Sequence, residues 1–433
     1  MMKMKEVINK CLFVVGAGFS KPASCKMSSE MLDDLRARIQ KNGKENLFSD
    51  VEKETLNFLL SCLSYHCEWR SIQSGGRFKF HPNIEELILL IRRIRNRENY
   101  LPYPVTGNWA DKLIQLEADF NSMSIEKGEE MNNLFSSIEL KIKKNLLEIW
   151  LKFDKSKRKF LYLKPLKSFF QNYSNENFCL DICSLNYDLV LENYFKEAGP
   201  WMGFSNGKWV GLESTPDNEN ERRRINLYKL HGSLNWIRNI AGEIWKKEKW
   251  ENKKKEENIN EQEEQDLEND PFIIFGQGVK TFSIEPFFSL IYNFKKLLKE
   301  KEYIFVIGYS FFDPYINNLL ISATLSNSKK IIIVNPNFGP DKIKRKTNDH
   351  FGECKDSGYQ QRLAKYIKEI QKNSFYSELP EFNVINVKHG SIFYIPWKTE
   401  KFIEKYFLEN GNLLKELVEK FERERKEIEK PFN

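Results

Sequence analysis

Residues 11–20 read CLFVVGAGFS, an apolar run that ends in a turn with two glycines. The run is short and rich in branched side chains, which is typical of a central strand in a parallel sheet. Gly16 and Gly18 permit a tight turn and let backbone N–H groups approach a phosphate. The helical pattern that follows, from Met31 to Ile39, would direct its positive end at that anion. Such a turn is also often only a tight connection.

Two further apolar runs end in polar segments. Residues 178–184 lead into Asn186 and Asp188, and residues 226–230 lead into His231. Because an open α/β sheet gathers its ligand site at the carboxyl ends of its strands, we expect these side chains beside the glycine turn. Each has a simpler interpretation, since a histidine after a strand is usually structural and Asp188 could equally cap the next helix.

Strand-like runs alternate with helical patterns along much of the chain. The candidate strands are residues 11–15, 178–184, 226–230, 272–275, 303–307, 330–334 and 383–388. This alternation predicts an α/β fold with a Rossmann-like, doubly wound parallel sheet. A long stretch of helical periodicity separates the first two strands, which indicates an inserted helical subdomain. Asn206-Gly207 and Ala241-Gly242 predict hairpin turns, and residues 250–270 predict a charged loop.

Composition favours a cytoplasmic protein with a large core. The chain has 433 residues, of which 41% are hydrophobic. No apolar stretch approaches the ~20 residues that cross a bilayer, and we expect neither a signal peptide nor a membrane partner. The 68 basic and 61 acidic residues are interspersed, so the net charge of +7 does not predict direct nucleic-acid binding.

The glycine turn, residues 184–188 (SLNYD) and residues 229–233 (KLHGS) together resemble the sirtuin fold, particularly its bacterial sirtuin-like relatives. Those proteins carry a Gly-Ala-Gly-x-Ser loop, a Thr/Ser-x-Asn-Tyr-Asp segment and a Leu-His-Gly-Ser segment in this order. Three later segments are also similar: residues 272–277 (FIIFGQ), 307–314 (IGYSFFDP) and 334–336 (VNP). The resemblance covers roughly residues 8–40 and 175–395. Several motifs in one order are harder to obtain by chance than one.

The resemblance implies roles for particular residues. Asn186 would orient the ribose or the attacking water, Asp188 would lie near the carboxamide, and His231 would be the base. The pyrophosphate would be held by Gly16, Ala17, Gly18, Phe19 and Ser20. Gly308, Ser310 and Asn335 would lie on the phosphate and adenosine side. Asp313, which precedes a proline, is typical of a helix start and not of a ligand.

The chain also departs from the protein-deacylating sirtuins. Those carry a zinc ribbon of two Cys-x-x-Cys pairs after the catalytic histidine, whereas this chain has no cysteine between Cys183 and Cys354. We therefore expect no zinc. Residues 23–27 (ASCKM) replace the family loop whose aromatic side chain and arginine manage acyl-lysine chemistry. These departures argue against deacylation and favour water as the nucleophile.

We expect three parts in the chain. Residues 1–44 and 166–397 would form a discontinuous, sirtuin-like NAD-binding catalytic domain, and residues 45–165 the inserted helical subdomain. Residues 398–433 would form a C-terminal amphipathic helical tail. Its apolar stripe consists of Ile403, Phe407, Leu414, Leu417, Phe421 and Ile428. The stripe must be covered, either by the chain's own core or by a second subunit.

The resemblance therefore implies an NAD hydrolase that releases nicotinamide and ADP-ribose. The similar bacterial proteins act in anti-phage defence, where depletion of NAD leads to abortive infection. We expect a homo-oligomer whose activity is controlled by a defence-system partner protein or a phage-derived activator. Other functions stay open: a non-catalytic module that senses NAD or ADP-ribose, a cyclase that forms cyclic ADP-ribose, and a zinc-free deacylase or ADP-ribosyltransferase.

Overall fold

The computed structural model divides the chain into two compact units. The α/β unit consists of Met1–Cys25, Phe153–Ile273 and Val279–Asn433, and the helical unit of Lys26–Lys152 and Ile274–Gly278. The structure describes residues 2–40, 47–73, 81–96, 109–126, 133–152, 157–173, 179–213, 225–239, 241–247, 271–274, 284–311, 313–324, 329–336, 378–379, 384–388 and 392–428.

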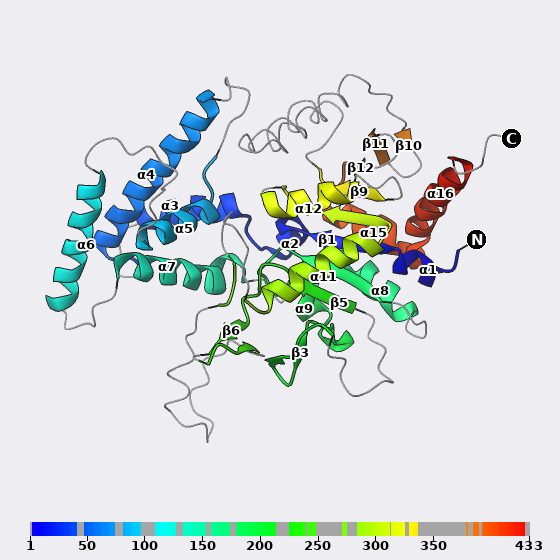
Figure 1. Ribbon diagram of the computed structural model, residues 1–433, viewed down its shortest axis with the longest axis horizontal. Helices are drawn as coiled ribbons and strands as arrows, with labels where there is room; N and C mark the ends of the chain where they lie inside the picture. The colour runs from blue at the N-terminus through cyan, green and yellow to red at the C-terminus, as the bar shows by residue number, and fades with distance from the viewer. Residues whose placement is uncertain are drawn as a thin grey trace. The chain divides into compact units, whose positions relative to one another are not determined.

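An eight-stranded sheet forms the centre of the α/β unit (Figure 1), in the order β10-β11-β12-β9-β8-β1-β2-β5. Its strands are β1 (Cys11–Val15), β2 (Leu180–Ser184), β5 (Ile225–Lys229), β8 (Tyr303–Ile307), β9 (Lys330–Val334), β10 (Glu378–Leu379), β11 (Val384–Lys388) and β12 (Ile392–Ile395). The six strands from β12 to β5 run parallel. Numbered along the chain, they lie in the Rossmann order 3-2-1-4-5-6. The predicted α/β fold with a parallel sheet is confirmed.

The order in which the chain adds strands to the sheet reverses between β1 and β8. Strand β1 pairs with β2 on one side and β8 on the other, and all residues of β1 and β8 are buried, which explains their wholly apolar sequences. The chain leaves these strands at Gly16 and Gly308. In open α/β sheets, this switch point is where ligands bind.

Two strand predictions were wrong. Residues 271–274 do not join the sheet, because Ile273 forms only a single bridge with Gly232. Strand β11 pairs antiparallel, and the last parallel strand is β12, which the sequence analysis missed. An apolar pattern does not record the direction of pairing, which depends on the connection between strands. The predicted loop of residues 250–270 lies outside the described residues.

The two predicted hairpins are confirmed in a small second sheet, whose order is β3-β4-β7-β6. Its strands are β3 (Phe204–Ser205), β4 (Lys208–Trp209), β6 (Trp236–Arg238) and β7 (Ile244–Lys246). Asn206 and Gly207, which connect β3 and β4, both have positive φ, as a two-residue hairpin loop of this type requires.

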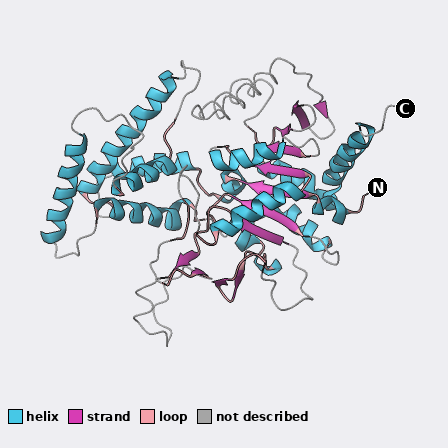
Figure 2. Ribbon diagram, viewed as in Figure 1, coloured by secondary structure: helices cyan, strands magenta, loops and turns pink. Residues whose placement is uncertain are grey.

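The helices of the α/β unit connect and cover the strands (Figure 2). They are α1 (Met4–Asn9), α2 (Ala17–Ser20), α8 (Lys164–Asn172), α9 (Val190–Tyr194), α11 (Phe287–Glu300), α12 (Pro314–Thr324), α15 (Thr399–Phe407) and α16 (Asn412–Ile428). The helix directly after the glycine turn is the four-residue α2. The long helix that was expected there is α3 (Ser28–Gln40), which belongs to the helical unit.

The C-terminal helices α15 and α16 pack on the core of the α/β unit. The ring of Phe407 lies 5.7 Å from that of Phe13 in β1, and the ring of Phe421 stacks at 5.8 Å on Tyr303 in β8. Leu417 has 0% of its surface exposed. The chain's own core therefore covers the stripe, and its interpretation as a subunit contact is wrong.

The described part of the helical unit consists mainly of helices. Besides α3, these are α4 (Asp50–Gln73), α5 (Ile84–Arg95), α6 (Trp109–Glu126) and α7 (Leu134–Asn145), which continues as a π-helical turn over Leu146–Trp150. Among the described residues of the whole chain, no helix is long and apolar enough to span a membrane.

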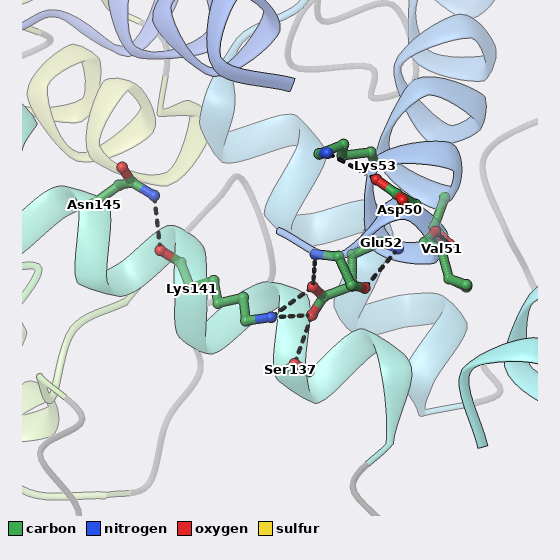
Figure 3. Close-up of polar contacts among 9 residues, drawn as sticks. Asp50, Val51, Glu52, Lys53, Ser137, Lys141 and Asn145 are labelled. Atoms are coloured by element: carbon green, nitrogen blue, oxygen red, sulfur yellow. Dashed lines mark hydrogen bonds and ion pairs between the residues drawn. The ribbon is translucent and has the colours of Figure 1, made fainter. Parts of the chain in front are cut away.

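A buried ion pair ties α4 to α7 (Figure 3). Ser49 and Glu52 form a capping box at the start of α4, in which the N–H of Ser49 donates to the Glu52 carboxylate and the N–H of Glu52 donates to Ser49 Oγ. The carboxylate of Glu52 is fully buried, and Lys141 Nζ and Ser137 Oγ each donate to its Oε1 at 2.7 Å. These partners satisfy a charge that would otherwise be costly to bury.

Candidate functional site

Two glycine turns interlock at the switch point of the sheet. The N–H of Gly16 donates to the carbonyl of Ile307 at 3.0 Å, and the N–H of Gly18 donates to the carbonyl of Gly308 at 2.8 Å. A Cβ atom on Gly16 would lie 2.6 Å from the Cα of Tyr309, and one on Gly18 would lie 2.9 Å from the Cα of Gly308. The close approach of the two backbones therefore requires glycine.

This contact changes the expected phosphate cradle. The N–H groups of Gly16 and Gly18 already have carbonyl partners at the end of β8, and the N–H of Phe19 donates to the carbonyl of Gly16 at 2.8 Å. The N–H of Ala17, at the first position of α2, has no backbone carbonyl partner among the described residues. The hydroxyl of Ser20 accepts from Asn186, and only 2% of Ser20 is exposed. The glycines shape the turn rather than supply its donors.

We predict that Gly308→Ala destabilises the protein more than Gly199→Ala. Both glycines have positive φ, +63° and +56°, so either alanine suffers a left-handed strain of ~1 kcal/mol. At Gly308 the new Cβ would also lie 2.5 Å from the backbone nitrogen of Phe19, whereas nothing lies within 4 Å at Gly199. Such overpacking adds ~1–3 kcal/mol. Denaturant unfolding measures both losses, and equal losses would contradict the interlock.

Asn186 joins the ends of β1 and β2. It is buried, and its Nδ2 donates to the carbonyl of Gly16 at 2.9 Å and to Ser20 Oγ at 3.1 Å. Its backbone N–H donates to Ser184 Oγ at 3.2 Å. The structure thus brings Asn186 against the glycine turn, as the strand ends predict, and the amide also supports the shape of that turn.

Asp188 lies two residues before the short helix α9, whose N-cap is Leu189. Its Oδ1 accepts a hydrogen bond from the N–H of Val190, the first helical residue, at 3.0 Å. The buried ammonium of Lys229 donates to the carbonyl of Asp188 and pairs with Glu192 at 2.9 Å. Burial raises the pKa of the Glu192 carboxyl. The described contacts of Asp188 therefore join the first N–H of α9 to the buried pair of Lys229 and Glu192.

His231 pairs with the carboxylate of Asp313, a residue whose sequence context predicts only a helix start. Its Nε2 lies 3.1 Å from Asp313 Oδ2, and only 6% and 8% of the two residues are exposed. Asp313 also caps α12, because its Oδ1 accepts from the N–H of Tyr315 at 3.0 Å. Asp313 follows β8, whose carboxyl end lies at the same sheet edge as His231. This placement was the signal that could have identified it.

The remaining predicted residues follow β8 and β9. Ser310 is exposed, and Asn335 Nδ2 donates to the carbonyl of Tyr309 at 3.3 Å. The N–H of Asn335 donates to the carbonyl of Ile395 in β12 at 3.1 Å. Asn335 therefore links the end of β9 to the turn after β8, next to Gly308.

Two residues from distant segments support the glycine turn, and the sequence analysis missed both. Tyr162 Oη donates to the carbonyl of Phe19 at 3.0 Å, and Thr399 Oγ1, at the start of α15, donates to the carbonyl of Gly18 at 3.2 Å. Both side chains are buried. No local motif marks either residue, because each reaches the turn only through the packing of the whole unit.

The described part of the chain has no group of three or more His, Cys, Asp or Glu side chains that could hold a metal ion. The six cysteines in this part of the chain form no disulfide with one another. The site at the switch point therefore consists of a glycine turn, an amide and a His–Asp pair.

Residues 181–349 match a family model described as a SIR2-like domain. The matched segment covers less than half of the chain. It contains Asn186, His231 and Asp313, and it begins after the glycine turn. No curated protein matches the chain.

Solved structures of Sir2 homologues are also similar to the chain. A mutant bound to 2′-O-acetyl ADP-ribose is 11% identical, with a TM-score of 0.37 over 100% of both chains. A homologue bound to NAD is 10% identical, with a TM-score of 0.35 over 97% of this chain and 96% of that one. TM-scores below 0.5 do not establish a common fold, whereas the strand order of the chain itself is that of a Rossmann-like sheet.

Proposed function

We propose that this chain is an NAD hydrolase that cleaves the bond between nicotinamide and ribose. The observation that carries the proposal is the buried pair of His231 and Asp313, which lies with Asn186 and the glycine turn at the carboxyl edge of a Rossmann-ordered sheet. The SIR2-like match over residues 181–349 supports a reaction of NAD. The Sir2 homologues whose solved structures hold NAD or ADP-ribose favour the same substrate.

The residues of the site fit a dinucleotide. The N–H of Ala17 and the hydroxyl of Ser20 would meet the pyrophosphate, and Gly308, Ser310 and Asn335 would lie on the adenosine side. Asn186 Oδ1 has no hydrogen-bond partner among the described residues, and it would orient the ribose or the attacking water. Asp188 would lie near the carboxamide, at the start of α9.

Hydrolysis needs one proton acceptor. The bond between the ribose carbon and the nicotinamide nitrogen breaks, and its electron pair leaves with the nitrogen, so that nicotinamide departs neutral. The water oxygen bonds to the same ribose carbon and loses a proton to the imidazole of His231. The products are nicotinamide and ADP-ribose. Orientation of the two reactants by the site supplies much of the rate enhancement.

We predict that the purified full-length protein, with its activator where one is needed, converts NAD into equal amounts of nicotinamide and ADP-ribose. Chromatography quantifies both products. Cyclic ADP-ribose in place of ADP-ribose would instead indicate a cyclase. Consumption of NAD only when an acylated or acceptor protein is added would indicate a zinc-free deacylase or an ADP-ribosyltransferase. Binding of NAD without release of nicotinamide would indicate a sensing module.

We further propose a regulated role in bacterial anti-phage defence, because the motif order resembles that of sirtuin-like defence proteins. An unrestrained NAD hydrolase would deplete the NAD of its own host, so its activity must be held back until a phage-derived activator or a partner protein acts. A homo-oligomer stays a prediction, and the stripe on α15 and α16 does not support it, because the described side chains of that stripe are buried within the chain. Light scattering of the purified protein measures its mass.

A further inference from the structure

The contact between His231 and Asp313 joins strands that are not neighbours. His231 follows β5 and Asp313 follows β8, and β1 and β2 lie between these strands in the sheet. The two residues are 82 positions apart, yet Nε2 and Oδ2 approach to 3.1 Å with both side chains buried. A buried carboxylate beside an imidazole interacts strongly with it, because little water screens the pair.

Hydrogen bonds other than the one to His231 fix the orientation of the Asp313 carboxylate. Its Oδ1 accepts from the N–H groups of Tyr315 and Ile316, at 3.0 and 3.4 Å, as the cap of the eleven-residue helix α12. The N–H of Asp313 donates to Tyr309 Oη at 3.1 Å, and that hydroxyl donates to Asn317 Oδ1 at 2.9 Å. One carboxylate oxygen thus serves the helix, and Oδ2 faces His231.

This arrangement decides which nitrogen of the neutral imidazole is basic. A carboxylate only accepts hydrogen bonds, so the nitrogen that faces it must carry the proton. Nε2 of His231 is therefore the donor to Asp313, and the lone pair of the neutral ring lies on Nδ1. A proton taken up at Nδ1 produces an imidazolium whose positive charge lies beside the Asp313 carboxylate.

We propose that Asp313 is a positioning residue for the reaction: it holds the proton of His231 on Nε2, so that Nδ1 takes the proton from the attacking water. The role of Nδ1 in taking a proton from water rests on the proposed function, which is NAD hydrolysis. The tautomer of His231, however, is a property of the protein without substrate. The role resembles that of the aspartate in a hydrolase triad, which orients a histidine without itself being protonated.

Two variants test the proposal. Asp313→Asn and Asp313→Ser both keep a residue that caps a helix well, so α12 should retain its start and the melting temperature should change little. Asparagine removes the charge, and serine is too short to reach the imidazole. We expect each variant to lower kcat by ~100-fold or more with little change in KM. Asn133→Ser alters the cap of α7 in the helical unit and serves as the control, with unchanged kcat.

Nitrogen NMR of the histidine side chains gives a readout that is independent of turnover. In the unsubstituted protein, His231 should show a single neutral tautomer with its proton on Nε2, and Asp313→Ser should show a mixture of tautomers. A proton on Nδ1 in the unsubstituted protein would overturn the proposal, even if the variants fail to fold. Unchanged kcat in a folded Asp313→Ser variant would also overturn it. If the unsubstituted protein releases no nicotinamide, the proposed function fails, and the NMR result still decides the tautomer.

Discussion

Replacing His231 by glutamine is expected to lower NAD turnover by ~100-fold or more while the protein stays folded. The imidazole is the only side chain of the described site that we assign as a base, and an amide cannot take up the proton. Glutamine can still donate a hydrogen bond to Asp313, so the buried carboxylate keeps a partner. His231→Ala should lose as much turnover, and it should also be less stable because it removes the hydrogen bond between the imidazole and Asp313 Oδ2.

The matched control is His66→Gln, which makes the same substitution on α4 of the helical unit. Its turnover should equal that of the unsubstituted protein. Turnover comes from the initial rate of nicotinamide release, and circular dichroism during heating gives the melting temperature. If His231→Gln melts normally and turns over NAD at the original rate, His231 is not the base.

Asn186→Ala is expected to disturb the structure of the glycine turn, whereas His231→Gln is not. The amide of Asn186 holds the carbonyl of Gly16 and the hydroxyl of Ser20, so its removal disturbs the glycine turn as well as the site. A buried acceptor without its donor costs ~1–3 kcal/mol. Lost turnover in this variant would therefore not by itself assign a chemical role to the amide.

The sequence predicted the parallel sheet because its central strands are buried on both faces and must be apolar throughout. It also placed Asn186 and His231 correctly at one sheet edge, since polar residues after buried strands share that edge. It missed β12 and misjudged the pairing of β11, because side-chain patterns do not encode the direction in which strands pair. The direction in which β11 and β12 pair depends on the connections between the strands and not on their composition.

Asp313 and the glycines show why the site was only partly predicted. The pattern Asp313-Pro314 correctly indicated a helix start, and the same side chain has a second oxygen that contacts His231 across two intervening strands. Gly16 and Gly18 indicated a close approach, and in the structure the backbone that approaches them is that of the turn after β8. Sequence shows that a position needs a small residue, but the neighbour that requires it is known only from the fold.

The substitution Leu417→Glu is expected to destabilise the α/β unit strongly. Leu417 has 0% exposure on the face of α16 that packs on the core, and an unpaired carboxylate there would cost several kcal/mol in addition to the lost leucine packing, which is worth ~2–5 kcal/mol. Leu408→Glu is the matched control, because Leu408 is 45% exposed and its substitution should change stability little. Denaturant unfolding compares the two variants.

This expectation also separates the two interpretations of the C-terminal stripe. If the stripe belongs to the core, Leu417→Glu lowers the unfolding midpoint. Thr399 of α15 donates to the carbonyl of Gly18. Turnover should therefore also fall when the packing of the C-terminal helices is disrupted. If the stripe instead joined subunits, light scattering would show a smaller particle with an unchanged unfolding midpoint. Rings from Phe13 and Tyr303 already fill the surface against α15 and α16, which leaves no room there for a second chain.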